Sequence, residues 1–162
     1  MVLAFWRQPC RRYRDFQIAY TLLTLNFVLP AISYAVAPET AMEQLTWLNA
    51  LLGGAPYTFP EAASRVWRYL GAANVMTLGL MCALLQLDLK RFYPVLVPLT
   101  FLKAYNATLF LFGFFAAPQY KVLLAVALFD YLTSAAFVFF ARRARGEIEG
   151  FSGALVPRPR FP

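Results

Sequence analysis

The chain has 162 residues, of which 60% are hydrophobic, 17% aromatic and only 14% charged. Soluble domains are usually about 45–50% apolar and about 25% charged, so this composition excludes an ordinary soluble domain, a disordered chain and a disulfide scaffold. The formal net charge is +7, and the chain has no histidine, the commonest general base, metal ligand and haem ligand. The length allows several membrane crossings of about 20 residues each but no sizeable second soluble domain.

Four apolar stretches, each bounded by charge, proline or glycine, predict transmembrane helices. They cover residues 16–37, 66–87, 95–116 and 121–140. A T-x-x-E capping box that begins at Thr58 predicts that the second helix starts before the membrane and covers residues 59–87. The first stretch is longer than the apolar core of a secretory signal and contains Pro30, so we interpret it as an uncleaved helix. Short loops at 88–94 and 117–120 make the helices that they join antiparallel neighbours. The sequence therefore predicts an all-α fold, an integral membrane four-helix bundle formed by residues 1–145.

The loop between the first two helices is expected to carry a helix of its own. Apolar residues recur at helical spacing between residues 39 and 52, which predicts an amphipathic helix that ends at Gly53. Trp47 suits the boundary between lipid and water. We expect this helix to lie on the outer membrane surface or to cap the bundle.

The lysine and arginine residues predict the orientation. If the N-terminus is cytoplasmic, eleven of them fall on that side: Arg7, Arg11, Arg12, Arg14, Lys90, Arg91, Arg142, Arg143, Arg145, Arg158 and Arg160. The opposite side then holds three: Arg65, Arg68 and Lys121. This bias predicts that both termini are cytoplasmic. We expect the membrane to be a bacterial inner membrane. It also accounts for the basic net charge by topology and anionic headgroups, so no nucleic acid partner is expected.

Each predicted transmembrane helix carries polar side chains about halfway across the bilayer. With about 1.5 Å of rise per residue, these side chains form one layer roughly 12–20 Å from the cytoplasmic boundary. The layer consists of Asn26, Asn74, Lys103, Asn106 and Asp130. A lone charge at this depth costs about 2.5–3.5 kcal/mol, so Lys103 and Asp130 are expected to pair. Pro30 also leaves the Asn26 carbonyl without its helical donor.

Three interpretations of this layer stay open. In the first, the layer has a structural role only, in which an ion pair and amide hydrogen bonds between helices fix the packing. It is a cavity in which Asp130 and Lys103 bind a polar substrate or relay protons. Or it is a face that meets another subunit within the membrane.

Small residues predict close helix packing, and the two cysteines are expected to be unpaired. Gly71, Gly79 and Ala83 give the second helix a surface that lets another helix approach closely. Cys10 and Cys82 are too far apart for a C-x-x-C motif, so we expect two free thiols and no metal site.

Residues 146–162 are expected to form an extended cytoplasmic tail. This segment has several prolines and arginines but too few apolar residues to fold alone. We expect a partner to hold it through Pro157, Arg158 and Arg160.

The second predicted helix begins with Arg65-Val66-Trp67-Arg68-Tyr69-Leu70-Gly71-Ala72-Ala73-Asn74, followed by Leu78-Gly79-Leu80. This segment resembles the DoxX-like group of small four-helix membrane proteins. The resemblance implies a four-helix membrane fold and association with an oxidoreductase, and it carries no site residue over to this chain.

The sequence contains no catalytic constellation, so the first hypothesis is a non-catalytic accessory or structural subunit of a larger membrane complex. An electron-transfer, respiratory or photosynthetic assembly would use such a subunit for packing, assembly, and lipid or cofactor shielding. No cofactor is predicted, although the aromatic rings are compatible with a bound lipid, quinone or carotenoid. The alternative is a small transporter or proton-coupled carrier that uses Lys103 and Asp130. A third hypothesis is a membrane enzyme with Asp130, Lys103 or Tyr105 as acid or base.

Overall fold

The computed structural model describes residues 9–56 and 61–150, without the side chains at 41 and 61–68. All regular structure in this part of the chain is helical: α2 Arg11–Val36, α3 Pro38–Leu51, α4 Glu61–Leu87, α5 Leu89–Phe92, the 3-10 turn η1 Tyr93–Val95, α6 Leu96–Ala116 and α7 Lys121–Glu149. Four segments are long and apolar enough to cross a membrane: Arg11–Val36, Tyr69–Leu87, Leu89–Ala116 and Lys121–Glu149. The predicted all-α fold with four such segments is confirmed.

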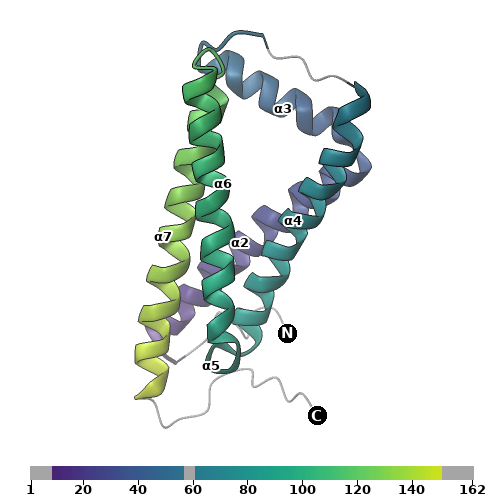
Figure 1. The fold of residues 1–162 in the computed structure, drawn as a ribbon. Helices are drawn as coiled ribbons and strands as arrows, with labels where there is room; N and C mark the ends of the chain where they lie inside the picture. The colour runs from purple at the N-terminus through teal and green to yellow at the C-terminus, as the bar shows by residue number, and fades with distance from the viewer. Residues whose placement is uncertain (1–8, 57–60, 151–162) are drawn as a thin grey trace.

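The long helices pack as two pairs. α2 lies along α4, α6 lies along α7, and α2 also packs against α7, whereas α4 and α6 share few contacts. The pairs meet at the end of the molecule formed by α5, here called the α5 end (Figure 1). They diverge toward the opposite end, here called the α3 end, where α3 crosses from one pair to the other (Figure 1).

Most of the hydrophobic core lies in the half of the molecule next to the α5 end. It consists of Cys10, Tyr13, Phe16, Tyr20, Phe27, Leu78, Cys82, Leu85, Leu89, Leu96, Leu99, Phe137, Ala141, Ala144 and Ile148. The Tyr20 ring of α2 lies 4.3 Å, between ring centroids, from Phe16 of the same helix. It also lies 5.9 Å from Phe137 of α7, so it links the two pairs of helices. Apolar packing therefore holds the four helices together mainly at one end.

Two predicted helix boundaries were wrong. The first helix begins at Arg11 instead of residue 16, and the last continues to Glu149 instead of ending at residue 140, so residues 146–149 are not extended tail. The last helix continues because Ala141, Ala144 and Ile148 recur on one face and are buried in the core. The start predicted for the second helix, residue 59, lies outside the described residues.

The predicted outer helix has nearly the expected bounds. α3 spans Pro38–Leu51, and Gly53 follows with a positive φ of 70°, the backbone conformation that commonly ends a helix at glycine. Trp47 is 65% exposed, as suits a side chain at a lipid boundary. The loop predicted at 88–94 is partly helical, because it contains α5 and the beginning of η1.

Candidate functional site

The charged pair expected from the sequence is present. Lys103 of α6 donates a hydrogen bond from Nζ to Oδ1 of Asp130 on α7. The two residues are 9% and 2% exposed. The short connection between α6 and α7 makes these helices antiparallel neighbours, so residues of matching depth on their facing sides lie close together. The site therefore contains one positive and one negative group that neutralise each other away from solvent.

Aromatic rings from two helices surround the lysine. Lys103 Nζ lies 5.1 Å from the ring centroid of Phe27 on α2 and 5.8 Å from that of Phe129 on α7. The negative face of an aromatic ring attracts a cation, most strongly where water is excluded. Phe27 thereby ties the α2–α4 pair to the charged site on the α6–α7 pair.

Hydroxyl groups lie one helical turn from the pair, toward the α5 end. Thr100 precedes Lys103 by three residues, and Ser134 follows Asp130 by four. Within the described part of the chain, the Thr100 and Ser134 side-chain oxygens are buried without a hydrogen-bond partner. Lys103 also has more N–H donors than its one bond to Asp130 uses. The site can therefore hold water or another small polar group.

The three asparagines of the predicted layer do not join this pair. Asn26 is exposed on the outside of α2. Asn74 and Asn106 are half-buried. None of the three side chains hydrogen-bonds to another described residue. The depth of a residue was predicted from its position along the helix, but the helix rotation that turns Asn26 outward depends on packing.

A second buried polar cluster was missed by the sequence analysis. Gln17 of α2 donates from Nε2 to the Tyr13 hydroxyl at 2.9 Å and to the Gln86 carbonyl of α4 at 3.0 Å. Gln86 in turn donates from its own Nε2 to Thr24 Oγ1 at 2.7 Å. The signal was present as polar residues at four-residue spacing on one stripe of α2, Tyr13, Gln17 and Thr21. These hydrogen bonds join α2 to α4 near the α5 end.

Asn49 was also missed, and it fixes the far end of α3. Its Nδ2 donates to the Ala55 carbonyl at 2.6 Å, and its Oδ1 accepts from the Val122 amide of α7 at 3.1 Å. A Cβ on Gly54 would lie 2.3 Å from Asn49 Oδ1, so only glycine leaves room for this side chain. α3 is thereby anchored to the beginning of α7.

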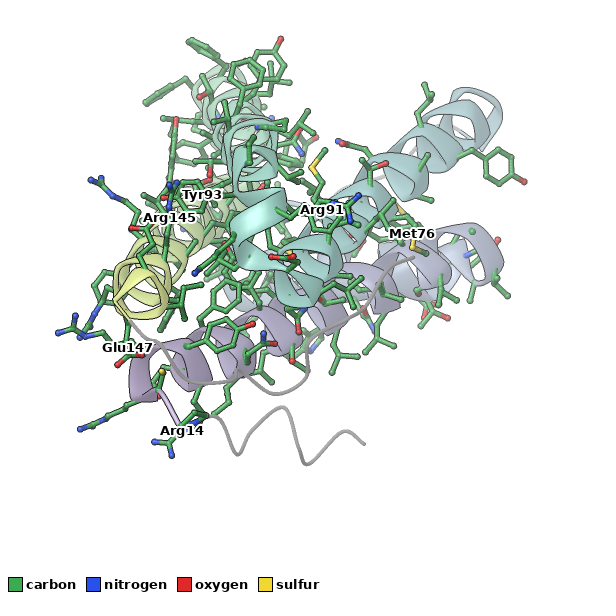
Figure 2. All side chains as sticks on the ribbon, turned by 90° about the horizontal axis from the view of Figure 1, so that it is seen from below. Arg14, Met76, Arg91, Tyr93, Arg145 and Glu147 are labelled. Carbon is green, nitrogen blue, oxygen red and sulfur yellow. The ribbon has the colours of Figure 1, made fainter. Side chains whose placement is uncertain are left out.

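Glu147 connects the beginning of α2 with the end of α7. Its Oε2 accepts a hydrogen bond from the Tyr13 amide at 3.0 Å, in the first turn of α2, where a carboxylate is stabilised by the helix dipole. Figure 2 views this end and shows Arg145 beside Tyr93, where the guanidinium lies 4.1 Å from the ring centroid. The described beginning of the first helix and the end of the last therefore lie together at the α5 end.

The predicted packing residues on α4 lie in different environments. A Cβ on Gly79 would meet Val28 Cγ2 of α2 at 2.9 Å, so this glycine permits close approach of the two helices. A Cβ on Gly71 would meet nothing within 4 Å, and Ala83 is half-buried. The predicted tail residues Pro157, Arg158 and Arg160 lie outside the described residues.

Other classes of site find little support in the described part of the chain. No three His, Cys, Asp or Glu side chains in residues 9–56 and 61–150 come close enough to hold a metal ion. Cys10 and Cys82 are buried free thiols, as predicted. The Lys103–Asp130 pair remains the candidate functional site.

Comparison with known proteins gives no relative. No protein-family model matches the chain, and neither the curated proteins nor the solved structures contain a significant match. The resemblance to the DoxX-like group therefore stays a prediction, and the function is argued from the physical features of this chain.

Proposed function

We propose that the chain is a non-catalytic accessory or structural subunit of a larger membrane complex, where it contributes packing and assembly and shields lipid or a cofactor. The observation that carries this proposal is the exposed amide of Asn26 about halfway along a membrane-spanning helix. An electron-transfer, respiratory or photosynthetic assembly is the kind of complex that suits such a subunit.

Asn26 presents two polar groups that hydrocarbon does not satisfy. Its side-chain amide has no partner among the described residues, and its carbonyl lacks the usual helical donor because Pro30 has no N–H. An unsatisfied polar group in the bilayer core costs several kcal/mol. Leu22, Leu25 and Leu29 surround Asn26 with exposed apolar side chains. A neighbouring transmembrane helix with a polar side chain would satisfy Asn26 and cover this face.

The charged pair supports a structural role. Lys103 and Asp130 are buried between helices and neutralise each other, and the Phe27 ring of α2 contacts the lysine. In some proteins a buried pair of this kind favours one helix arrangement over the alternatives. Under this proposal the pair holds the α2–α4 and α6–α7 pairs in the relative position that a partner recognises.

We also propose the orientation predicted from the sequence, with the α5 end and both termini in the cytoplasm of a bacterial cell. The described basic residues at the α5 end, among them Arg14, Arg91 and Arg145, support this orientation (Figure 2). The tail residues Pro157, Arg158 and Arg160 are proposed to contact the same partner complex from the cytoplasmic side.

Substitution of Asn26 tests the proposal. The native protein is extracted in mild detergent, and co-purifying subunits are counted by mass spectrometry for the wild type, Asn26→Leu and Thr77→Val. Thr77 is a matched control, because this exposed hydroxyl already bonds to the Ala73 carbonyl of its own helix at 2.8 Å. A transmembrane side-chain hydrogen bond contributes about 0.6–2 kcal/mol, so Asn26→Leu should weaken association about threefold to thirtyfold. Partner recovery that is unchanged in Asn26→Leu would contradict the proposal.

The buried hydroxyls of Thr100 and Ser134 favour a second candidate, a small transporter or proton-coupled carrier. Together with Lys103 and Asp130 they form a polar region about halfway along α6 and α7, where polar groups often mark a transport path. This candidate requires water to reach the pair. Proton flux into vesicles that contain the protein, abolished by Asp130→Asn, would support it, and no flux above that of empty vesicles would exclude it.

A further inference from the structure

A cavity lies beneath α3, between this helix and the last turns of α2. Its volume is about 540 Å³, within the range of small-molecule sites. The residues around it are Leu29, Pro30, Ser33, Tyr34, Gln44, Leu45, Trp47 and Leu48. It is thus formed by two helices that are consecutive in the chain.

The cavity exists because α3 is held at its two ends. At its beginning, α3 follows the end of α2, where the Ala37 amide bonds to the Ser33 carbonyl at 2.8 Å. At its other end, Asn49 binds the Val122 amide of α7. The helix pairs diverge toward α3 (Figure 1), and the cavity lies between the middle of α3 and the end of α2. An apolar space of this size loses the packing contacts that stabilise protein interiors unless another molecule fills it.

The α2 side of the cavity changes from polar to apolar with depth. Ser33 and Tyr34 lie in the last turn of α2 and, with Gln44 of α3, offer uncharged hydrogen-bonding groups at the α3 end. Leu29 lies one turn deeper on α2 and offers apolar surface, to which α3 adds Leu45 and Leu48. Trp47 lies beside the cavity. Because tryptophan rings favour the boundary between headgroups and hydrocarbon, this position suits a cavity at that boundary.

We propose that the glycerol region and one acyl chain of a single glycerophospholipid, from the leaflet at the α3 end, occupy this cavity. Its ester and glycerol oxygens accept hydrogen bonds from Ser33, Tyr34 and Gln44, and one acyl chain lies along Leu29, Leu45 and Leu48. The cavity has no charged lining residue, so the headgroup charge does not determine binding. The lipid replaces the missing packing between α3 and the diverging helices. This inference needs the membrane but no partner subunit, so it stands apart from the proposed function.

Trp47 reports on the cavity by fluorescence. The full chain with Trp6→Phe and Trp67→Phe keeps Trp47 as its one tryptophan and is purified in detergent micelles free of lipid. Phosphatidylcholine with brominated acyl chains, which quench tryptophan, is then added in small amounts. The proposal predicts saturable quenching that is complete at one lipid per chain. Brominated phosphatidylglycerol should give the same half-saturation as phosphatidylcholine.

Two substitutions separate this site from general lipid contact. Ser33→Phe fills the cavity and should remove the saturable quenching, and Leu48→Phe gives a second filling variant from α3. Val97→Phe is the control, since it adds the same ring at an exposed groove next to Phe101 and Val138, away from α3. Thermal unfolding identifies any variant that does not fold. Quenching that rises without saturation, or saturable quenching that persists in folded Ser33→Phe and Leu48→Phe, would overturn the proposal.

Discussion

Lys103 and Asp130 show how pairing with an opposite charge lowers the cost of a charged side chain in the membrane. Each alone would be an uncompensated charge about halfway along a membrane-spanning helix, and together they form a neutral, buried pair. The pair is held at the meeting point of α6, α7 and the Phe27 ring of α2. Its contribution is therefore expected to be specificity of packing.

A double-mutant cycle on the pair measures this contribution. Lys103→Met and Asp130→Leu each leave one buried charge unpaired, and each should lower the free energy of unfolding by about 3–5 kcal/mol. The double variant has no buried charge and should recover most of that loss. Unfolding in detergent, followed by helical circular dichroism, gives the three values. Losses that simply add in the double variant would contradict a coupled pair.

The sequence was sufficient to predict some of these residues and insufficient for others. Matching depth on a helical hairpin predicted the contact between Lys103 and Asp130. The same reasoning gave the depth of Asn26 but not the side of α2 on which it lies, because rotation about the helix axis depends on which other faces are buried. Gln17 and Asn49 were missed because their bonds to the Gln86 carbonyl and the Val122 amide depend on the tertiary fold.

Among the elements, α7 continues beyond its apolar stretch and contacts the beginning of α2. Its last two turns leave the most apolar region but keep packing through Ala144 and Ile148. Glu147 then reaches the first turn of α2. A run of arginines followed by glycine was interpreted as the end of a membrane helix, although arginine and alanine favour helix and tertiary contacts continue it.

Replacement of Glu147 tests this connection. Glu147→Gln removes the negative charge at the beginning of α2, where an acidic group contributes about 0.3–1 kcal/mol, or up to about 2 when partly buried. Glu149→Gln is the control, since its pair with Arg145 within α7 is solvent-exposed. The free energy of unfolding and amide exchange in the first turn of α2 should change for Glu147→Gln only. Equal effects of both substitutions would mean that Glu147 does not stabilise α2.

For the whole molecule, the arrangement combines a packed α5 end with an open α3 end. The core, the Gln17–Gln86 hydrogen bonds and the Glu147 contact all hold the α5 end together. At the α3 end, α3 bridges diverging helix pairs. The number and character of the helices followed from hydropathy, whereas this divergence did not, because it results from the distribution of side-chain packing along each interface.

The proposed orientation has its own test. Cysteine is introduced for Glu43 at the α3 end or Arg142 near the α5 end, both exposed, and intact cells are treated with a membrane-impermeant maleimide. Glu43→Cys should be labelled in intact cells, and Arg142→Cys only after disruption. Cys10 and Cys82 are 5% and 0% exposed, so they should contribute little background. Burial, with the nearby Glu147 carboxylate, also raises the pKa of the Cys10 thiol, which lowers its reactivity toward the maleimide. Reversed labelling would contradict the orientation.

The proposed role in a larger complex depends most directly on the size of the native particle. The chain alone has a mass of 18.3 kDa. Extraction from native membranes into polymer-bounded discs, followed by mass measurement and identification of the polypeptides, should give a heavier particle with other subunits in fixed ratio. A particle that contains only this chain and lipid, whether as one copy or several, would contradict the account.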